Sequence, residues 1–196
     1  MTFSYFCFKI ILGENFMIYN YKELLKKYGN DYQISLALNQ NEIWKVEEGI
    51  YSDTEYPSET AIIAKKYPNA IFTMDNAFYA YGLTDVIPRK YHLAIRQNRK
   101  KIIDPKVESI YISKEFFEIG KTTLTVNNAV VNIYDKERML IELVRNKNQI
   151  PYDYYKEILN NFRDNVANLE IRKIQQYIKH FKNGDLIFRT IRNEVY

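Results

Sequence analysis

The order of helical and alternating segments between residues 17 and 55 is the feature that most constrains the fold of this chain. Residues 21–28 repeat apolar side chains at helical spacing and are followed by glycine, which favours a helix end. An Asn-Asp pair can cap a second helix over residues 31–40. Its side chains expected to face inward are Tyr32, Ile34 and Leu38. Two short strands around a turn at Glu48-Gly49 complete the order helix, turn, helix and hairpin, which predicts a minimal winged helix-turn-helix module.

Beyond this module the two periodicities alternate, and we place the domain boundary between Ser52 and Pro57. The strands are predicted at 91–95, 109–112, 122–126 and 130–134, with a tight hairpin turn at Asn127-Asn128. The helices are predicted within 57–68, opening at Pro57 and Ser58, at 74–81 with Thr73 as N-cap, and at 136–146, 152–163, 169–181 and from Gly184 or Asp185 onward. The predicted fold class is α/β (α+β): a winged helix-turn-helix-like module over 17–55, then a mixed-sheet α/β domain over 56–196 with a helical C-terminal part.

Composition excludes several classes of protein. Hydrophobic residues make up 46% of the chain, yet no apolar run reaches the ~20 residues that cross a bilayer, so we expect no membrane partner. A single cysteine, Cys7, cannot form an internal disulfide and fits the reducing cytoplasm. The six glycines are too dispersed for a dinucleotide-binding fingerprint or a P-loop, so no cofactor is expected.

Residues 1–16 are rich in apolar and aromatic side chains, but they do not match a signal peptide. Lys9 interrupts the run, no basic residue precedes it, and no small-residue cleavage site follows. The segment is either a short element packed on the body or an extension upstream of a start at Met17. We favour the extension.

The predicted module has polar side chains of the kind that DNA-binding domains use to contact bases, but it lacks the net positive charge that is usual in such domains. Its candidate DNA-binding residues are Gln33, Ser35, Asn39, Gln40 and Lys45. Amide side chains can read adenine edges, but phosphate contacts need cations. Residues 17–55 hold four basic and seven acidic side chains, a net charge of −3. Weak operator binding is therefore the expectation from charge alone.

Positive charge is concentrated further along the chain. Residues 56–196 carry 23 basic and 16 acidic side chains, and the densest run lies between residues 89 and 106. Its cations are Arg89, Lys90, Arg96, Arg99, Lys100, Lys101 and Lys106. The run is either an electrostatic footprint for nucleic acid or an acidic partner, or a solvated strand edge whose lysines prevent edge-to-edge pairing.

Two segments resemble the signature regions of the AbiEi-like antitoxins of type IV toxin–antitoxin systems. The first contains Asp75-Asn76-Ala77-Phe78-Tyr79, then Tyr81-Gly82-Leu83-Thr84 and Pro88; the second runs from Asp135 through Glu137-Arg138 to Leu143. Gly49-Ile50-Tyr51 is similar to the end of the family's hairpin. The resemblance covers about residue 17 to 196. It implies operator DNA as a partner, a homodimer or paired sites on a palindrome, and direct or indirect antagonism of a nucleotidyltransferase-type toxin.

The antitoxin-motif residues Asp135, Glu137 and Arg138 have two interpretations. Asp135 stands where a helix N-cap belongs, and Glu137 suits the positive end of that helix. Arg138 and Glu142 are spaced to form an ion pair along the helix surface. Capping and packing explain most of the motif. The alternative is a polar site used against the toxin.

Catalytic alternatives have little support, and we expect that the chain is not an enzyme. Its two histidines, His92 and His180, have no partner at metal-ligand spacing, so no metal site is predicted. Asp104 and Glu108 beside the basic run could imitate a nuclease site. An antitoxin-like regulator is the preferred hypothesis. Its rivals are a protein-interaction module without a DNA role and, more weakly, a nucleic-acid-processing enzyme.

Overall fold

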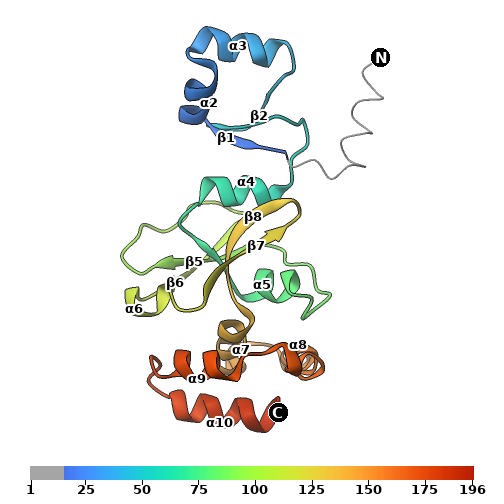
Figure 1. Ribbon diagram of the computed structural model, residues 1–196, viewed down its shortest axis with the longest axis vertical. Coiled ribbons are helices and arrows are strands. Elements are labelled where there is room, and N and C mark those ends of the chain that lie inside the picture. The colour runs from blue at the N-terminus through green and yellow to red at the C-terminus, as the bar shows by residue number, and fades with distance from the viewer. Residues whose placement is uncertain (1–15) are drawn as a thin grey trace. The chain divides into compact units, whose positions relative to one another are not determined.

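The computed structural model describes residues 16–196, and these form two compact units. The first unit runs to Pro68 and takes in Thr125–Val131, and the second holds Asn69–Leu124 and Asn132–Tyr196. Figure 1 shows the elements of both units. Cys7 and the predicted extension, apart from its last residue, lie outside the described residues.

The first unit has a small antiparallel sheet beside two helices. The sheet has the order β1-β3-β2, formed by β1 (Ile18–Asn20), β2 (Trp44–Glu47) and β3 (Ile50–Ser52). Helices α2 (Tyr21–Tyr28) and α3 (Asp31–Asn39) lie between β1 and β2 in the chain. The predicted two helices and hairpin are thus confirmed, while strand β1 was not predicted. Its signal is weak because three residues are too short for a visible alternation.

Local chemistry fixes both helices of this unit. The Asn20 side chain accepts a hydrogen bond from the Glu23 backbone N–H, and the Glu23 carboxylate accepts one from the Asn20 N–H, which forms a capping box. Asn30 caps α3 by accepting from the Gln33 N–H. The core they enclose consists of Tyr19, Leu24, Ile34, Ala37 and Ile43.

Helix α4 (Glu59–Lys66) belongs to the first unit as well. Lys65 Nζ lies 2.5 Å from Glu23 and Lys66 Nζ 2.7 Å from Glu47, so α4 is tied both to α2 and to the β2–β3 hairpin. The compact unit therefore extends past the predicted boundary at residues 52–57. Its two cations neutralise carboxylates of the module and are not free to meet a partner.

The second unit contains a five-stranded mixed sheet of order β6-β5-β4-β8-β7. Its strands are β4 (Ile71–Phe72), β5 (Tyr91–Arg96), β6 (Val107–Ile112), β7 (Lys121–Val126) and β8 (Ala129–Tyr134). Strand β4 pairs antiparallel with β5 and parallel with β8, and β5 pairs parallel with β6. The tip of the β7–β8 hairpin falls in the first unit. Both turn residues predicted for that hairpin, Asn127 and Asn128, have positive φ.

Six helices surround this sheet or extend beyond it. They are α5 (Met74–Ala80), α6 (Lys114–Phe117), α7 (Lys136–Arg145), α8 (Tyr152–Asp164), α9 (Ile171–Ile178) and α10 (Gly184–Glu194). Helices α7 to α10 gather at one end of the sheet, in the orange and red part of Figure 1. The predicted fold class, mixed α/β with a helical C-terminal part, is confirmed. Within residues 16–196, no helix is long and apolar enough to cross a membrane.

Candidate functional site

Helix α3 presents the predicted DNA-reading side chains to solvent. Gln33, Ser35, Asn39 and Gln40 are exposed, while Ile34 and Ala37 hold the opposite face in the core. The prediction that Tyr32 faces inward is wrong, because 73% of its surface is exposed. Tyr32 lies one turn ahead of Ser35 and Leu36, and the buried stripe passes through Ile34 instead. Helix α3 thus offers amide and hydroxyl groups, with no cation among its nine residues.

The remaining predicted DNA contact, Lys45, lies on the first strand of the wing. Its ammonium is 2.9 Å from the Glu48 carboxylate, and both side chains are largely exposed. An exposed pair of this kind is worth little and can open when a stronger anion arrives. On α2, Lys22 and Lys26 are exposed one turn apart. The first unit therefore has few cations to spare for phosphates.

The basic run does not form one surface. Arg89, Lys90 and Lys106 lie at the starts of the parallel strands β5 and β6. Arg96 and Arg99 lie at the far end of β5, which is about 16 Å away because a strand rises about 3.3 Å per residue. Lys100 and Lys101 follow in the exposed connection that returns to the start of β6. These basic side chains are neighbours in the sequence, but the fold separates them, so they do not act as one charged surface.

Arg96 is also engaged within the unit. Its guanidinium contacts the Glu118 carboxylate at 2.5 Å and lies over the Phe117 ring, 5.1 Å from the centroid. The same carboxylate has its pKa held below the ordinary value, first by its hydrogen bond from Arg96. One of the seven predicted cations therefore serves the fold.

The Asp135 and Glu137 carboxylates both serve local structure. Asp135 Oδ1 accepts from the Arg138 N–H at 2.8 Å, as predicted for an N-cap, and Oδ2 accepts from the Tyr177 hydroxyl at 2.7 Å. Burial raises the pKa of Asp135 despite these two hydrogen bonds. Glu137 is 5% exposed and accepts from the Glu170 N–H at 2.9 Å, which fastens the segment that leads into α9.

Arg138 is fully buried, so the predicted surface bridge to Glu142 is wrong in its location. The two side chains do pair, with the guanidinium 2.8–2.9 Å from Glu142 Oε1. Arg138 Nη1 also donates to the carbonyls of Phe116 and Ile119, at 2.8 and 2.9 Å. The guanidinium therefore joins α7 to the segment after β6. Spacing revealed the pair, but only the fold reveals that the pair is internal.

Gly120 makes this arrangement possible, and sequence reasoning missed it. A Cβ atom on Gly120 would lie 2.5 Å from the Arg138 Cβ, and the residue has φ of +74°. Its carbonyl accepts from the Asp135 N–H at 2.7 Å. An isolated glycine three residues past a short aromatic helix carried no visible signal of this role.

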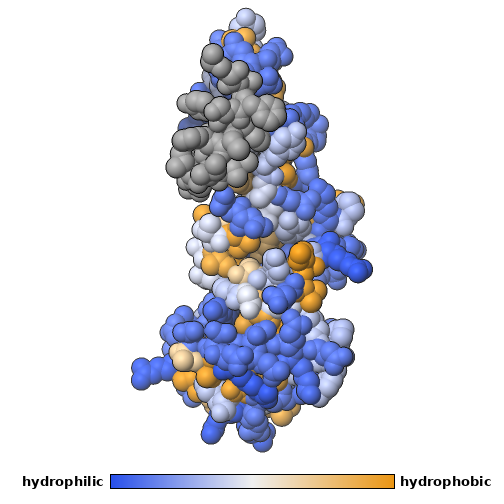
Figure 2. Space-filling view, turned by 90° about the vertical axis from the view of Figure 1, so that its right-hand side faces the viewer, coloured by the Kyte–Doolittle hydropathy of each residue, from blue (hydrophilic) through white to orange (hydrophobic). Residues whose placement is uncertain are grey.

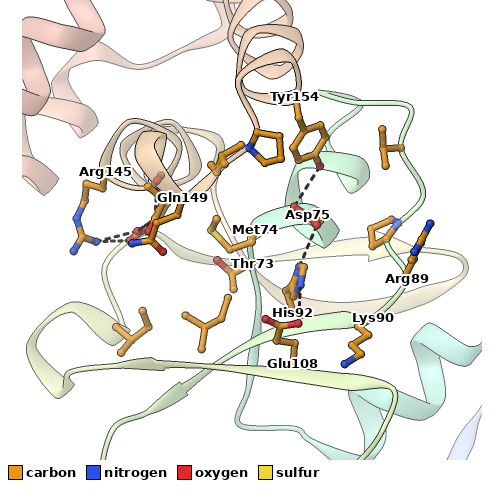
Figure 3. Close-up of a pocket in the computed structure, with 18 of the residues that line it drawn as sticks. Thr73, Met74, Asp75, Arg89, Lys90, His92, Glu108, Arg145, Gln149 and Tyr154 are labelled. Carbon is orange, nitrogen blue, oxygen red and sulfur yellow. Dashed lines mark hydrogen bonds and ion pairs between the residues drawn. The ribbon is translucent and has the colours of Figure 1, made fainter.

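The second unit has a cleft of about 810 Å³ whose lining includes residues 73–75 and 86–88. Four polar side chains follow one another along one wall in Figure 3: Tyr154, Asp75, His92 and Glu108. The Tyr154 hydroxyl donates to Asp75 at 3.3 Å. His92 Nδ1 lies 3.6 Å from Asp75 and Nε2 3.6 Å from Glu108, both longer than a hydrogen bond.

The sequence predicted only part of the arrangement along this wall. In the sequence, His92 has no partner at metal-ligand spacing, yet its side chain stands between two carboxylates, and its buried Nδ1 has no hydrogen-bond partner among residues 16–196. Asp104 accepts from the Lys106 N–H and is absent from the cleft lining. The lining contains no serine or cysteine, and the described residues hold no cluster suited to a metal ion.

Met74, which lines the cleft, has an unusual backbone conformation. It has φ of +46° at the turn from β4 into α5, a region costly for a side-chain-bearing residue. Thr73, predicted as the helix N-cap, occupies that position but makes no capping hydrogen bond, since its hydroxyl contacts Met139 Sδ at 3.7 Å. The Thr73 backbone N–H instead donates to the His92 carbonyl at 3.0 Å, which fastens the turn to β5.

The chain matches no protein-family model, and no curated protein matches it at a significant level.

Proposed function

We propose that this chain is a cytoplasmic antitoxin of the AbiEi-like kind that counters a nucleotidyltransferase-type toxin and represses its own operon. The observation that carries the proposal is the β1-α2-α3-β2-β3 order of the first unit, with α3 turning Gln33, Asn39 and Gln40 to solvent. A helix with exposed amides beside a two-stranded wing suits insertion into the major groove. The family-like segments in the second unit add support from an independent part of the chain.

The antidote activity belongs, in this proposal, to the second unit. The motif residues Asp135, Glu137 and Arg138 support that activity indirectly, because internal hydrogen bonds and the ion pair with Glu142 engage their charged groups. Antagonism of the toxin therefore acts through the outer surface of the unit, and a tight complex with the toxin is not required.

Operator binding is testable by fluorescence anisotropy with a duplex of the chain's own promoter and a scrambled duplex of equal length. We expect preference for the promoter and two chains per palindromic duplex. The variant Gln33→Ala/Asn39→Ala/Gln40→Ala should lose that preference, since each base-edge pair contributes about 1–3 kcal/mol of discrimination. A matched triple variant on exposed α8 positions, Tyr152→Ala/Lys156→Ala/Asn160→Ala, should retain it. Equal binding of promoter and scrambled duplexes at low salt contradicts the repressor role.

A second candidate, a protein-interaction module without a DNA role, is favoured by one observation. The first unit is acidic, and Lys45, Lys65 and Lys66 are all paired with carboxylates. An acidic surface repels phosphates and suits a basic protein partner. The anisotropy experiment separates the two candidates, because an interaction module binds neither duplex through α3.

A further inference from the structure

Helices α9 and α10 form a helical hairpin in the second unit. Five residues connect them, and both pack against α7. A Cβ atom on Gly184 would lie 2.2 Å from the Ile178 carbonyl oxygen, so only glycine allows this close turn. In the turn, Phe181 stacks on Phe116 with ring centroids 5.1 Å apart. The side chains on the outer face of the hairpin are therefore held on a fixed frame.

The hairpin carries an excess of positive charge that the fold does not neutralise. Residues 171–196 hold six basic and two acidic side chains. Lys173 pairs with Glu170 at 2.5 Å, and the acidic Glu194 is held by Lys147 at 2.6 Å. The other five cations make no ion pair with any described residue: Arg172, Lys179, Lys182, Arg189 and Arg192.

Arg172, Arg189 and Arg192 lie on exposed helix faces among amides, and Lys179 and Lys182 lie in the turn that connects the helices. On α10 the exposed residues fall within an arc of about 120°, given 3.6 residues per turn: Asp185, Leu186, Arg189, Arg192 and Asn193. The exposed face of α9 carries Arg172, Gln175 and Gln176. In Figure 2 the helical end of the second unit is largely hydrophilic. Asp185 is the only carboxylate on the exposed α10 face.

We propose that this outer face of the α9–α10 hairpin binds the phosphodiester backbone of a nucleic-acid duplex. Arginine, lysine, glutamine and asparagine are the side chains that contact phosphates and sugars. A protein interface of ordinary size would need an apolar, aromatic centre, and this face offers only Leu186 and Ile171 as exposed apolar groups on the two helices. The assignment goes beyond the proposed operator reading, since it concerns the other unit and needs no base contact.

The test is the salt dependence of duplex binding by the full chain. The variant Arg189→Gln/Arg192→Gln keeps good helix formers on α10 and removes two charges. Each lost phosphate contact lowers the slope of log K against log salt by about 0.9, so the pair should lower it by about 1.8, or about 60-fold in affinity at 0.1 M salt. Lys114→Gln/Lys156→Gln, which removes two exposed charges from α6 and α8, should leave the slope unchanged.

Scrambled DNA and RNA duplexes of one sequence serve as separate probes, and their comparison tells which backbone is bound. A second variant, Arg172→Gln/Lys179→Gln on α9 and its C-cap, should also lower the slope and guards against a folding defect in the first. An unchanged slope for both folded variants overturns the proposal, as does failure of the parent to bind either duplex at about 50 mM salt. Failure of the operator proposal appears differently, as loss of promoter preference with the salt slope retained.

Discussion

Replacing Arg138 by methionine should destabilise the second unit by about 5 kcal/mol. The side chain is fully buried, and its removal leaves Glu142 without its inner partner. Breaking a buried ion pair in this way typically costs about 3–5 kcal/mol, and the abandoned carbonyls of Phe116 and Ile119 each add about 1–3 kcal/mol. Arg145, which also reaches Glu142, offsets part of the total.

The assay is thermal unfolding followed by circular dichroism or calorimetry. A loss of about 5 kcal/mol corresponds to a fall in Tm of about 10–20 °C for a chain of this size. The matched control is Arg145→Met on the same helix, whose half-exposed guanidinium should cost about 1 kcal/mol or less. Arg138→Met/Glu142→Gln should recover part of the loss, because it removes the uncompensated charge. An Arg138→Met protein as stable as the parent would refute the internal role and return this guanidinium to the toxin-directed hypothesis.

Two further predictions concern the helical end of the second unit. Gly184→Ala should lower the free energy of unfolding, measured with denaturant, by about 1–3 kcal/mol, because the added Cβ meets the Ile178 carbonyl. The control Asn183→Ala, at the exposed neighbouring position, should change it by about 0.5 kcal/mol or less. Equal effects of the two substitutions would contradict the close turn. Burial opposes ionisation of Glu194, but its hydrogen bond from Lys147 prevails and holds its pKa below the ordinary 4.5. A carboxyl group whose pKa is lowered by folding stabilises the folded state fully above its ordinary pKa, and this stabilisation is lost as the pH falls below that value. Glu194→Gln should therefore flatten the dependence of Tm on pH below about 4.5. An unchanged profile would mean that the ion pair does not contribute.

Elements governed by neighbouring residues were the predictable part of the fold. Local chemistry predicts Asp135 as an N-cap, the Asn127-Asn128 turn and a last helix that begins at Gly184 or Asp185, and the structure confirms each, with that helix beginning at Gly184. Helix ends were less accurate, as for α9, where the predicted end at residue 181 passes the observed Ile178. Beyond Ile178 the chain turns into the hairpin, a tertiary effect.

Features set by distant contacts could not be predicted. Nothing in the sequence around Arg138 says that its ion pair is covered by the rings of Tyr134 and Phe181. Likewise, the parallel pairing of β5 with β6 places the basic side chains of residues 89–106 at both ends of these strands. This pairing was hard to predict because the ten-residue connection between the strands is shorter than most parallel crossovers. The wall of Tyr154, Asp75, His92 and Glu108 needs four elements to meet, and no spacing along the chain encodes that meeting.

The most direct test of the antitoxin proposal is growth rescue from the product of the adjacent nucleotidyltransferase-type gene. Co-expression of the full chain should restore growth, and the Gln33→Ala/Asn39→Ala/Gln40→Ala variant should restore it equally, because those side chains belong to the other unit. Arg138→Met should fail to restore growth at temperatures where the second unit unfolds. No rescue by the soluble parent chain, or the absence of such a neighbouring gene, would contradict the account.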